Sequence, residues 1–215
     1  MLKTFIQKLK FLKSVEYANE RAYIIFDGKL HLIAHKSCRV IIKGVLKIGG
    51  ELPLSPAIPS YNKTCIIMEP ESSLIIEDDV YIASGTMLNI KKGASLTFKG
   101  KNYIGYNNYI MCSSKMMIGK NTSTSWNVTL IDHDGHTLYN QFGKPLKRLM
   151  KPLIIEDNVG IQMNVTIPTG NHIGESSLIG ANSVIRESIP KNTFVYHSNE
   201  LRKKNGISAG LQFIT

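Results

Sequence analysis

Aliphatic residues recur at a fixed spacing of six in the last third of the chain. The unbroken run comprises Ile155, Ile161, Ile167, Ile173, Ile179 and Ile185. Neither the 3.6-residue period of an α-helix nor the two-residue period of a lone strand produces this spacing, whereas hexapeptide repeats are a signature of parallel β-helices. The pattern predicts an all-β solenoid in which one aliphatic side chain per step points into a narrow core, while small neighbouring residues let the backbone turn each corner.

The same step recurs earlier in the chain with more variation. Three shorter runs keep it: Ile76, Ile82 and Leu88; Ile104, Ile110 and Met116; Ile118, Thr124 and Leu130. A β-sandwich would instead show varied strand spacing between turn signals. We therefore expect β-helical coils from about residue 30 to residue 190.

The first residues follow a helical period. An apolar face is formed by Leu2, Phe5, Ile6, Leu9 and Leu12, and lysines fill the remaining faces. This pattern predicts a short amphipathic helix. Such a basic helix either packs against the rest of the protein, which is the commoner outcome, or makes a peripheral contact with an anionic membrane.

The register of the repeat breaks between Leu130 and Ile155, where the intervening residues are polar and basic. A solenoid accommodates such an insertion as a loop leaving one corner, and loops on rigid scaffolds commonly carry binding and catalytic groups. The expected organisation is a helical segment over 1–21, a β-helix over 22–192 with a loop at 131–154, and a tail over 193–215.

Composition narrows the setting of the protein. The 215 residues are 43% hydrophobic and 20% charged, as in soluble globular proteins, and the net charge of +10 suits acidic partners or serves solubility alone. Cys38, Cys65 and Cys112 are far apart, which argues for buried thiols in a reducing compartment. We found neither a membrane-spanning apolar run nor a signal-peptide pattern, so we expect a cytoplasmic protein.

The repeat "IIEDNVGIQMNVTIPTGNHIGESSLIGANSVIRESIP", preceded by "SWNVTLIDHDGH", resembles the hexapeptide-repeat acyltransferases. The likeness covers roughly residues 70–192 and is greatest to O-acetyltransferases that modify polysaccharides and other sugars. It implies a left-handed parallel β-helix, a homotrimer, and acetyl-CoA bound in a groove between neighbouring β-helices. The implied acceptor is a saccharide, with no role for nucleic acid.

The resemblance also implies catalytic roles within the "DHDGH" segment. His136 matches the histidine that acts as general base on the acceptor hydroxyl, and Asp132 and Asp134 match acidic positions of the motif. His133 is a neighbouring candidate. A sugar hydroxyl is a poor nucleophile at neutral pH, so an imidazole is a suitable base. A carboxylate that accepts the other ring N–H would orient it, and either aspartate fits this role.

Further candidates lie on both sides of the loop. The candidate acceptor-binding residues are Trp126, Asn127 and Tyr139, and the candidate coenzyme-binding residues are Ala181, Ser183, Arg202 and Lys203. Each group has a structural alternative: Trp126 as a core or interface aromatic, the small residues as coil corners, and the basic residues as a solvated tail.

Two places differ from the family pattern. The family's "VWIG" step reads "VGIQ" here, with Gly160 and Gln162, and its "AGNPAK" loop is replaced by "VYHSNELRKK" at 195–204. Both places border the presumed donor site.

Several functional readings remain open. Acetyl transfer from acetyl-CoA to a saccharide hydroxyl is preferred over amino-sugar N-acetylation and over a non-catalytic trimeric scaffold. A zinc site formed by His133, His136 and His172 does not match the usual ligand spacing, so no metal is expected. The histidines can also be read as solvated residues of an Asp–Gly turn.

Overall fold

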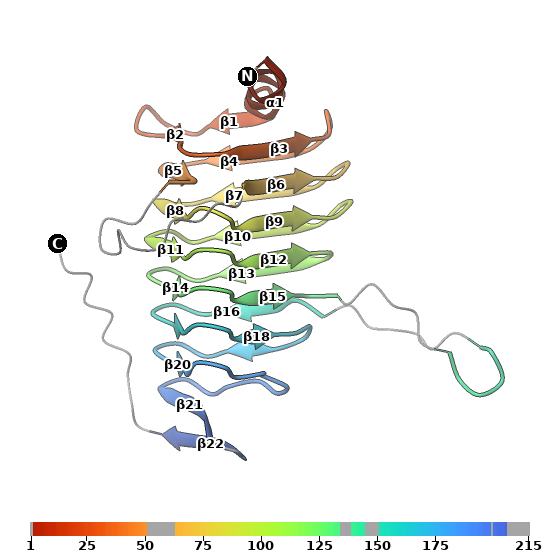
Figure 1. Cartoon of the computed structure of the whole chain (residues 1–215), viewed down its shortest axis with the longest axis vertical. Coiled ribbons are helices and arrows are strands. Elements are labelled where there is room, and N and C mark those ends of the chain that lie inside the picture. The colour runs from red at the N-terminus through yellow and green to blue at the C-terminus, as the bar shows by residue number, and fades with distance from the viewer. Residues whose placement is uncertain (1, 51–62, 134–138, 145–150, 199, 206–215) are drawn as a thin grey trace.

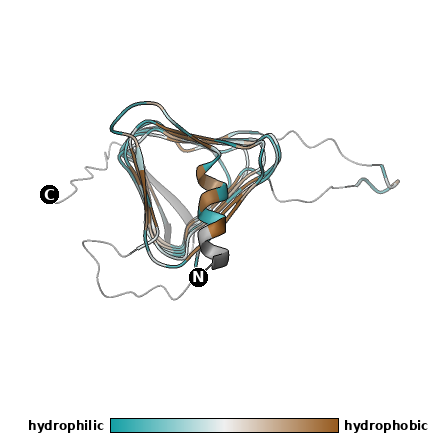
Figure 2. Cartoon of the chain, turned by 90° about the horizontal axis from the view of Figure 1, so that it is seen from above, coloured by the Kyte–Doolittle hydropathy of each residue, from teal (hydrophilic) through white to brown (hydrophobic). Residues whose placement is uncertain are grey.

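The computed structural model describes residues 2–50, 63–133, 139–144, 151–198 and 200–205. One helix, α1 (Leu2–Leu12), precedes strands that wind into a long prism (Figure 1). Viewed down the prism, the coils superimpose as a triangle with three flat faces (Figure 2). The structure confirms the predicted all-β, left-handed parallel β-helix.

Each face of the prism is a sheet of parallel strands, named here A, B or C, and only the last strand of sheet B, β22, runs antiparallel among the described strands. Sheet A contains β1 (Val15–Tyr17), β4 (Arg39–Ile42), β7 (Ser73–Ile76), β10 (Ser95–Phe98), β13 (Lys115–Ile118), β16 (Leu153–Ile155) and β19 (His172–Ile173). Sheet B contains β2 (Tyr23–Phe26), β5 (Val45–Ile48), β8 (Val80–Ile82), β11 (Asn102–Ile104), β14 (Ser123–Thr124), β17 (Gly160–Ile161), β20 (Leu178–Ile179), β21 (Thr193–Ser198) and β22 (Glu200–Asn205). Sheet C contains β3 (Leu30–Ala34), β6 (Thr64–Met68), β9 (Met87–Ile90), β12 (Tyr109–Cys112), β15 (Thr129–Ile131) and β18 (Thr166–Ile167).

Equivalent residues of successive coils lie directly beside one another. On sheet A, for example, Leu74 pairs with Val40 on one side and with Leu96 on the other. Successive side chains in a strand point to opposite faces of the sheet, so one set of residues from all coils stacks in the interior. The triangular core is therefore a column of aliphatic layers.

The six isoleucines at a step of six all point into this core. Ile161 is 3% exposed and the other five are fully buried. The earlier runs behave in the same way: Thr124 is 3% exposed and their remaining members are fully buried. The prediction of an inward aliphatic residue at every step is thus confirmed.

Asparagine residues, rather than only small ones, turn many of the corners. At the corner between sheets B and C, Asn107, Asn127, Asn164 and Asn182 have φ angles between 55° and 60°. Asparagine is among the few non-glycine residues that adopt this left-handed conformation readily. The side-chain amides of Asn127 and Asn164 each donate to the next asparagine oxygen, at 3.2 and 3.0 Å. The corner is therefore held by both backbone conformation and a side-chain ladder.

The predicted N-terminal helix covers one end of the prism, but with a different face inward. Phe11 is fully buried and its ring meets that of Phe26 edge-on, with centroids 6.2 Å apart. Ile6 and Leu9, expected on the packed face, are 42% and 45% exposed. The prediction of that face was wrong, because the largest apolar side chain near the helix end fills the open mouth of the core instead. Among the described residues, no helix is both long and apolar enough to cross a membrane.

The coils extend beyond the expected boundaries. β1 already pairs with β4 from Val15, ahead of residue 22, and β21 continues sheet B after residue 192. Two insertions interrupt the coils. Residues 51–62 separate β5 from β6 and lie outside the described residues, and the expected loop separates β15 from β16.

Replacing one interior isoleucine tests the stacked core. Ile167→Ala should lower the free energy of unfolding by about 2–5 kcal/mol, because it leaves a cavity between two aliphatic layers. Denaturant titration followed by circular dichroism measures the change. Val184→Ala, at a position that is 47% exposed, is the matched control and should change stability by less than about 0.5 kcal/mol. Equal effects of the two substitutions would contradict this description of the core.

Candidate active site

The excursion begins at a buried carboxylate. Asp132 follows β15 directly and is fully buried. One of its carboxylate oxygens accepts the backbone N–H of Ser113 at 2.6 Å, and the other accepts that of Ser114 at 2.9 Å. Ser113 and Ser114 form the corner between β12 and β13, one coil earlier. Hydrogen bonds to an ionised acceptor are stronger than neutral ones, so Asp132 fixes the point where the loop leaves the prism.

The thiol beside this carboxylate is not a nucleophile at neutral pH. Burial raises the pKa of Cys112 to about 12, and the nearby negative charge of Asp132 adds to the shift. The thiol lies 3.3 Å from the Ser95 carbonyl, to which it donates. Cys112 and Cys38 are both buried, as expected for cysteines that pack as small apolar residues. Cys65 is only half-buried, so the expectation of a buried thiol does not hold there.

Only part of the "DHDGH" segment is described. His133 is half-buried and next to Asp132 at the corner between sheets C and A. Asp134 and His136 lie outside the described residues. Their predicted roles as orienting carboxylate and general base therefore stay predictions.

Trp126 and Asn127 lie at a different corner, between sheets B and C. The half-buried Trp126 accepts the Asn164 N–H at 2.9 Å through its carbonyl oxygen. Asn127 is exposed and donates its side-chain amide to Asn164. These contacts give both residues a structural role in the corner, while the exposed surface of each remains available to an acceptor.

The predicted coenzyme residues Ala181 and Ser183 lie on the same corner and its flank. The Ala181 N–H donates to the side-chain oxygen of Gln162 at 3.0 Å. Gln162, which differs from the family pattern, therefore already uses this hydrogen-bond donor. Ser183 is fully buried, and its hydroxyl has no hydrogen-bond partner among the described residues. Its predicted contact with the coenzyme stays a prediction. Gly160, the other residue that differs from the family pattern, is buried in β17.

The remaining candidates lie in the excursion and at the C-terminal end. Tyr139 is 62% exposed and precedes a tight turn in which the Asn140 side chain accepts the N–H groups of Phe142 and Lys144, each at 3.0 Å. Arg202 and Lys203 belong to β22, which pairs antiparallel with β21. The expected tail is therefore, in part, a hairpin that extends sheet B, and the side chains of these two residues lie outside the description.

The structure thus separates the predicted site residues into two groups. Asp132 and His133 lie where sheet C meets sheet A, whereas Trp126, Asn127 and Ala181 lie where sheet B meets sheet C. The width of sheet C, on the order of 10 Å for a strand of three or four residues, lies between the groups. No single corner of one chain brings them together.

The described residues include only two of the three histidines of the zinc alternative, because His136 lies outside them. His172 lies on the outer face of β19 and its ring nitrogen is 2.7 Å from a carboxylate oxygen of Glu156. Glu156 also accepts the Glu175 N–H, and these contacts lower its pKa, with the backbone contact as the largest cause. Within the part of the chain that the structure describes, no three potential ligands cluster.

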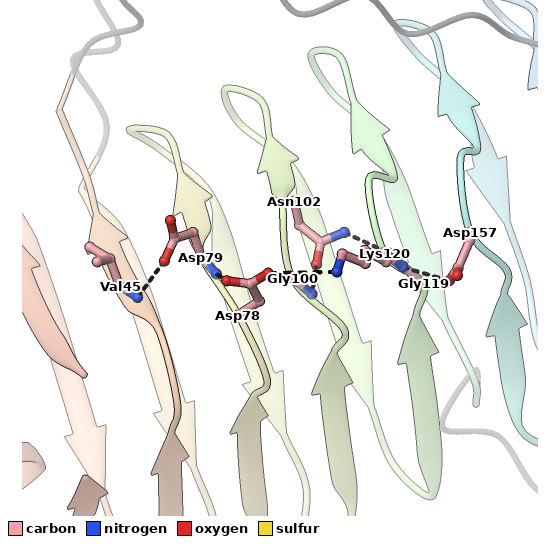
Figure 3. A network of polar contacts seen from close by, with 8 residues as sticks. All are labelled: Val45, Asp78, Asp79, Gly100, Asn102, Gly119, Lys120 and Asp157. Atoms are coloured by element: carbon pink, nitrogen blue, oxygen red, sulfur yellow. Dashed lines mark hydrogen bonds and ion pairs between the residues drawn. The ribbon is translucent and has the colours of Figure 1, made fainter. Parts of the chain in front are cut away.

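A second polar network occupies the corner between sheets A and B, where Figure 3 shows it from close by. Asp79 accepts the Val45 N–H at 2.8 Å, and Asp157 accepts the Lys120 N–H at 2.7 Å. Asp78 accepts the Asp79 N–H at 2.9 Å and lies 3.8 Å from the Lys120 ammonium. These carboxylates satisfy backbone donors where strands end. The network therefore supports the corner and offers no acid–base pair.

A cleft of about 540 Å³ lies beside this network on sheet B. Tyr81 and Tyr103 line it and stack with ring centroids 5.6 Å apart, and the Lys47 ammonium lies 5.0 Å from the centre of the Tyr81 ring. Burial raises the pKa of Tyr103 above its ordinary value. Because the ring faces contact one another and a cation, this cleft suits packing rather than acid–base chemistry.

Comparison with known proteins identifies sugar acetyltransferases as relatives. The galactoside O-acetyltransferase of Escherichia coli (strain K12) is 32% identical over 118 residues, which are 54% of this chain and 53% of that protein. The galactoside O-acetyltransferase of Lactococcus lactis subsp. lactis (strain IL1403) is 25% identical over 146 residues, 65% of this chain and 70% of that protein. The chain thus spans about half the length of the Escherichia coli relative. No protein-family profile matches the chain.

A solved structure shares the fold over nearly the whole chain. The polySia-specific acetyltransferase NeuO superimposes with a TM-score of 0.53, covers 94% of this chain and 84% of its own, and is 17% identical. The structural likeness supports the β-helix, and the sequence relatives confirm the resemblance to hexapeptide-repeat sugar O-acetyltransferases.

Substitution of Asp132 tests its structural role. Asp132→Ala should lower the free energy of unfolding by about 2–4 kcal/mol, because two N–H groups at a buried corner lose their acceptor. Asp157→Ala is the control, since that exposed carboxylate accepts one backbone N–H, and it should cost about 1 kcal/mol. Thermal and denaturant unfolding report both changes. Unchanged stability in Asp132→Ala would show that this carboxylate does not anchor the loop.

Proposed function

We propose that this protein is an acetyl-CoA-dependent O-acetyltransferase whose acceptor is a hydroxyl group of a saccharide or polysaccharide precursor. One observation carries the proposal: a buried carboxylate, Asp132, anchors a histidine-containing excursion at a coil corner, in a chain whose relatives are named as galactoside O-acetyltransferases. A rigid scaffold and a loop histidine are what acyl transfer to an alcohol requires.

In the proposed reaction, His136 accepts the proton of the sugar hydroxyl while its oxygen attacks the thioester carbonyl carbon. The negative charge that develops on the carbonyl oxygen is stabilised by backbone N–H donors. The C–S bond then breaks, and the coenzyme leaves as a thiol that takes the proton from the imidazolium. Asp134 is the better candidate for orienting His136, because both carboxylate oxygens of Asp132 already accept backbone N–H groups.

The donor would bind along the corner that holds Ala181. Its backbone N–H is a suitable donor for an amide carbonyl of the pantetheine arm, once the Gln162 side chain releases it. Arg202 and Lys203, together with a net charge of +10, suit the coenzyme phosphates. Trp126, Asn127 and Tyr139 are the proposed acceptor-side residues.

A homotrimer would complete the site. Asp132 and His133 lie at a different corner of the prism from Ala181. The proposed catalytic and coenzyme-binding residues would therefore meet when the sheet C–sheet A corner of one protomer lies against the sheet B–sheet C corner of its neighbour. Such a heterologous contact closes into a ring when the rotation between protomers closes. The free thiols of Cys38, Cys65 and Cys112 favour a cytoplasmic location.

A non-catalytic scaffold is the second candidate. Gln162, in place of the glycine of the family pattern, occupies the Ala181 N–H, and the buried Ser183 offers no surface contact. Thermal stabilisation by millimolar acetyl-CoA would favour the enzyme, because ligand binding to the native state raises its stability. No shift would favour the scaffold. Coenzyme A release with sugars against amino sugars as acceptors separates O- from N-acetylation.

The base assignment can be tested at His136. His136→Ala should lower kcat by roughly two to four orders of magnitude and remove an ionisation near neutral pH from the pH–rate profile, because the acceptor loses its base. Donor affinity should change little. His133→Ala is the matched control and should cost less. Near-normal turnover in a folded His136→Ala protein would reject the assignment, and joint loss of bound zinc and activity in both variants would favour a metal site instead.

The proposed oligomer predicts the mass in solution. Light scattering coupled to size exclusion should give three times the chain mass of 24.0 kDa. Mixing His136→Ala protomers with protomers of a Gln162→Trp variant, which blocks the donor corner, should then restore activity. At an interface between the two variants, the first supplies an intact donor corner and the second supplies an intact His136. A mass near one chain would leave the site incomplete and would overturn this arrangement.

A further inference from the structure

The apolar residues of α1 do not all face the protein: Phe11 is fully buried, whereas Ile6 and Leu9 are exposed. Phe11 enters the mouth of the core, and the Lys8 ammonium lies 5.1 Å from the centre of the Phe26 ring. Gln7, on the same side, is 3.4 Å from a ring nitrogen of His31. The packed side of the helix is therefore the one that carries Gln7, Lys8 and Phe11.

The opposite side presents aliphatic groups among lysines. Ile6 and Leu9 are 42% and 45% exposed, and Lys10 and Lys13 are exposed as well. Residues three and four apart lie on one side of a helix, so Ile6, Leu9 and Lys10 lie on one side of α1, and Lys13 follows in the turn directly after it. A helix that only covers a core would place polar residues on this side.

The charge of this end of the prism is predominantly positive. The exposed cations of α1 and the first coil include Lys10, Lys13, Arg21, Lys29 and Lys36. Of the three acidic residues in the first coil, Glu16 is bonded to Arg39 at 3.0 Å, Asp27 lies 3.8 Å from Lys47, and Glu20 is exposed. Aliphatic side chains beside the exposed Lys10 and Lys13, at an end of the prism with more exposed cations than anions among the described residues, are complementary to an anionic lipid surface, where each cation and each inserted side chain adds to the affinity.

The position of α1 makes this strip accessible to a flat surface. The helix lies at the extreme end of the long axis, with the described strands stacked below it (Figure 1) and its axis across the triangular mouth (Figure 2). We infer that the N-terminal end of the prism docks onto an anionic bilayer, with Ile6 and Leu9 entering the headgroup region and the long axis standing away from the membrane. This inference is independent of the proposed function.

Sedimentation with vesicles tests the docking. The full-length protein should co-sediment with phosphatidylcholine vesicles that contain about one-third phosphatidylglycerol, and much less with pure phosphatidylcholine. Raising the salt concentration from about 0.1 M to about 0.5 M should weaken binding, because the lysine contribution is screened. Ile6→Glu/Leu9→Glu should lower the bound fraction about tenfold or more, because two aliphatic groups are replaced by anions.

Matched single substitutions identify the surface used. Leu9→Glu should weaken vesicle binding several-fold, whereas Val184→Glu, at a position of similar exposure (47%) far along the prism, should not. Circular dichroism should show both proteins folded, and acetyl transfer to a soluble acceptor should be unaffected by Leu9→Glu. Equal binding of Leu9→Glu and the unaltered protein would overturn the proposal. Full competition by soluble glycerophosphoglycerol would also overturn it, because that result indicates a binding site for a single headgroup. A halved assembly mass of Leu9→Glu in the absence of vesicles would overturn it as well, because that result indicates end-to-end pairing of two copies.

Discussion

The registered stacking of one coil on the next is the interaction on which the rest of this structure depends. Each strand pairs with its equivalents in the coils before and after, as when Ile110 pairs with Leu88 and Leu130. Because the ladder fixes register, a slip of one residue would turn every inward aliphatic side chain outward. The core and the hydrogen bonds therefore enforce the same alignment, and corners as well as faces line up along the axis.

Chemistry is available mainly at those corners. The faces are short strands whose backbone groups pair within the sheets, whereas a corner leaves N–H groups that need side-chain acceptors. Asp132, Asp79 and Asp157 each serve such donors, and the asparagine ladder serves the corner between sheets B and C. An excursion that starts from a corner thus begins at a point already fixed by polar contacts. A fixed starting point of this kind is what the proposed function requires of the scaffold.

The sequence predicted the later coils well and the first coils poorly, for a physical reason. From residue 153 the outward neighbours of the core isoleucines are mostly small or polar, so the step of six stands out. In β2 the apolar residues Ile24 and Ile25 are adjacent, and in β4 so are Ile41 and Ile42. Apolar residues on both sides of a strand hide the period of the repeat. The insertion at 51–62 had a signal in its three prolines, Pro53, Pro56 and Pro59, which disfavour a sheet interior. The burial of Ser183 depends on the conformation of a coil corner, and that of Phe11 depends on how the helix closes the end of the core. The spacing of apolar residues in the sequence reveals neither.

A stack of identical steps has no inherent length, and a parallel coil with bare ends is a template for further strands. Here the two ends differ from the repeat: α1 lies across one mouth, and β22 reverses direction against β21 at the other. A reversed strand cannot continue a parallel winding, and a helix offers no strand edge. These two elements therefore cover the N-terminal mouth of the core and the last parallel strand of sheet B, where a further parallel strand could otherwise add. Loss of either would convert a folding motif into an aggregation hazard.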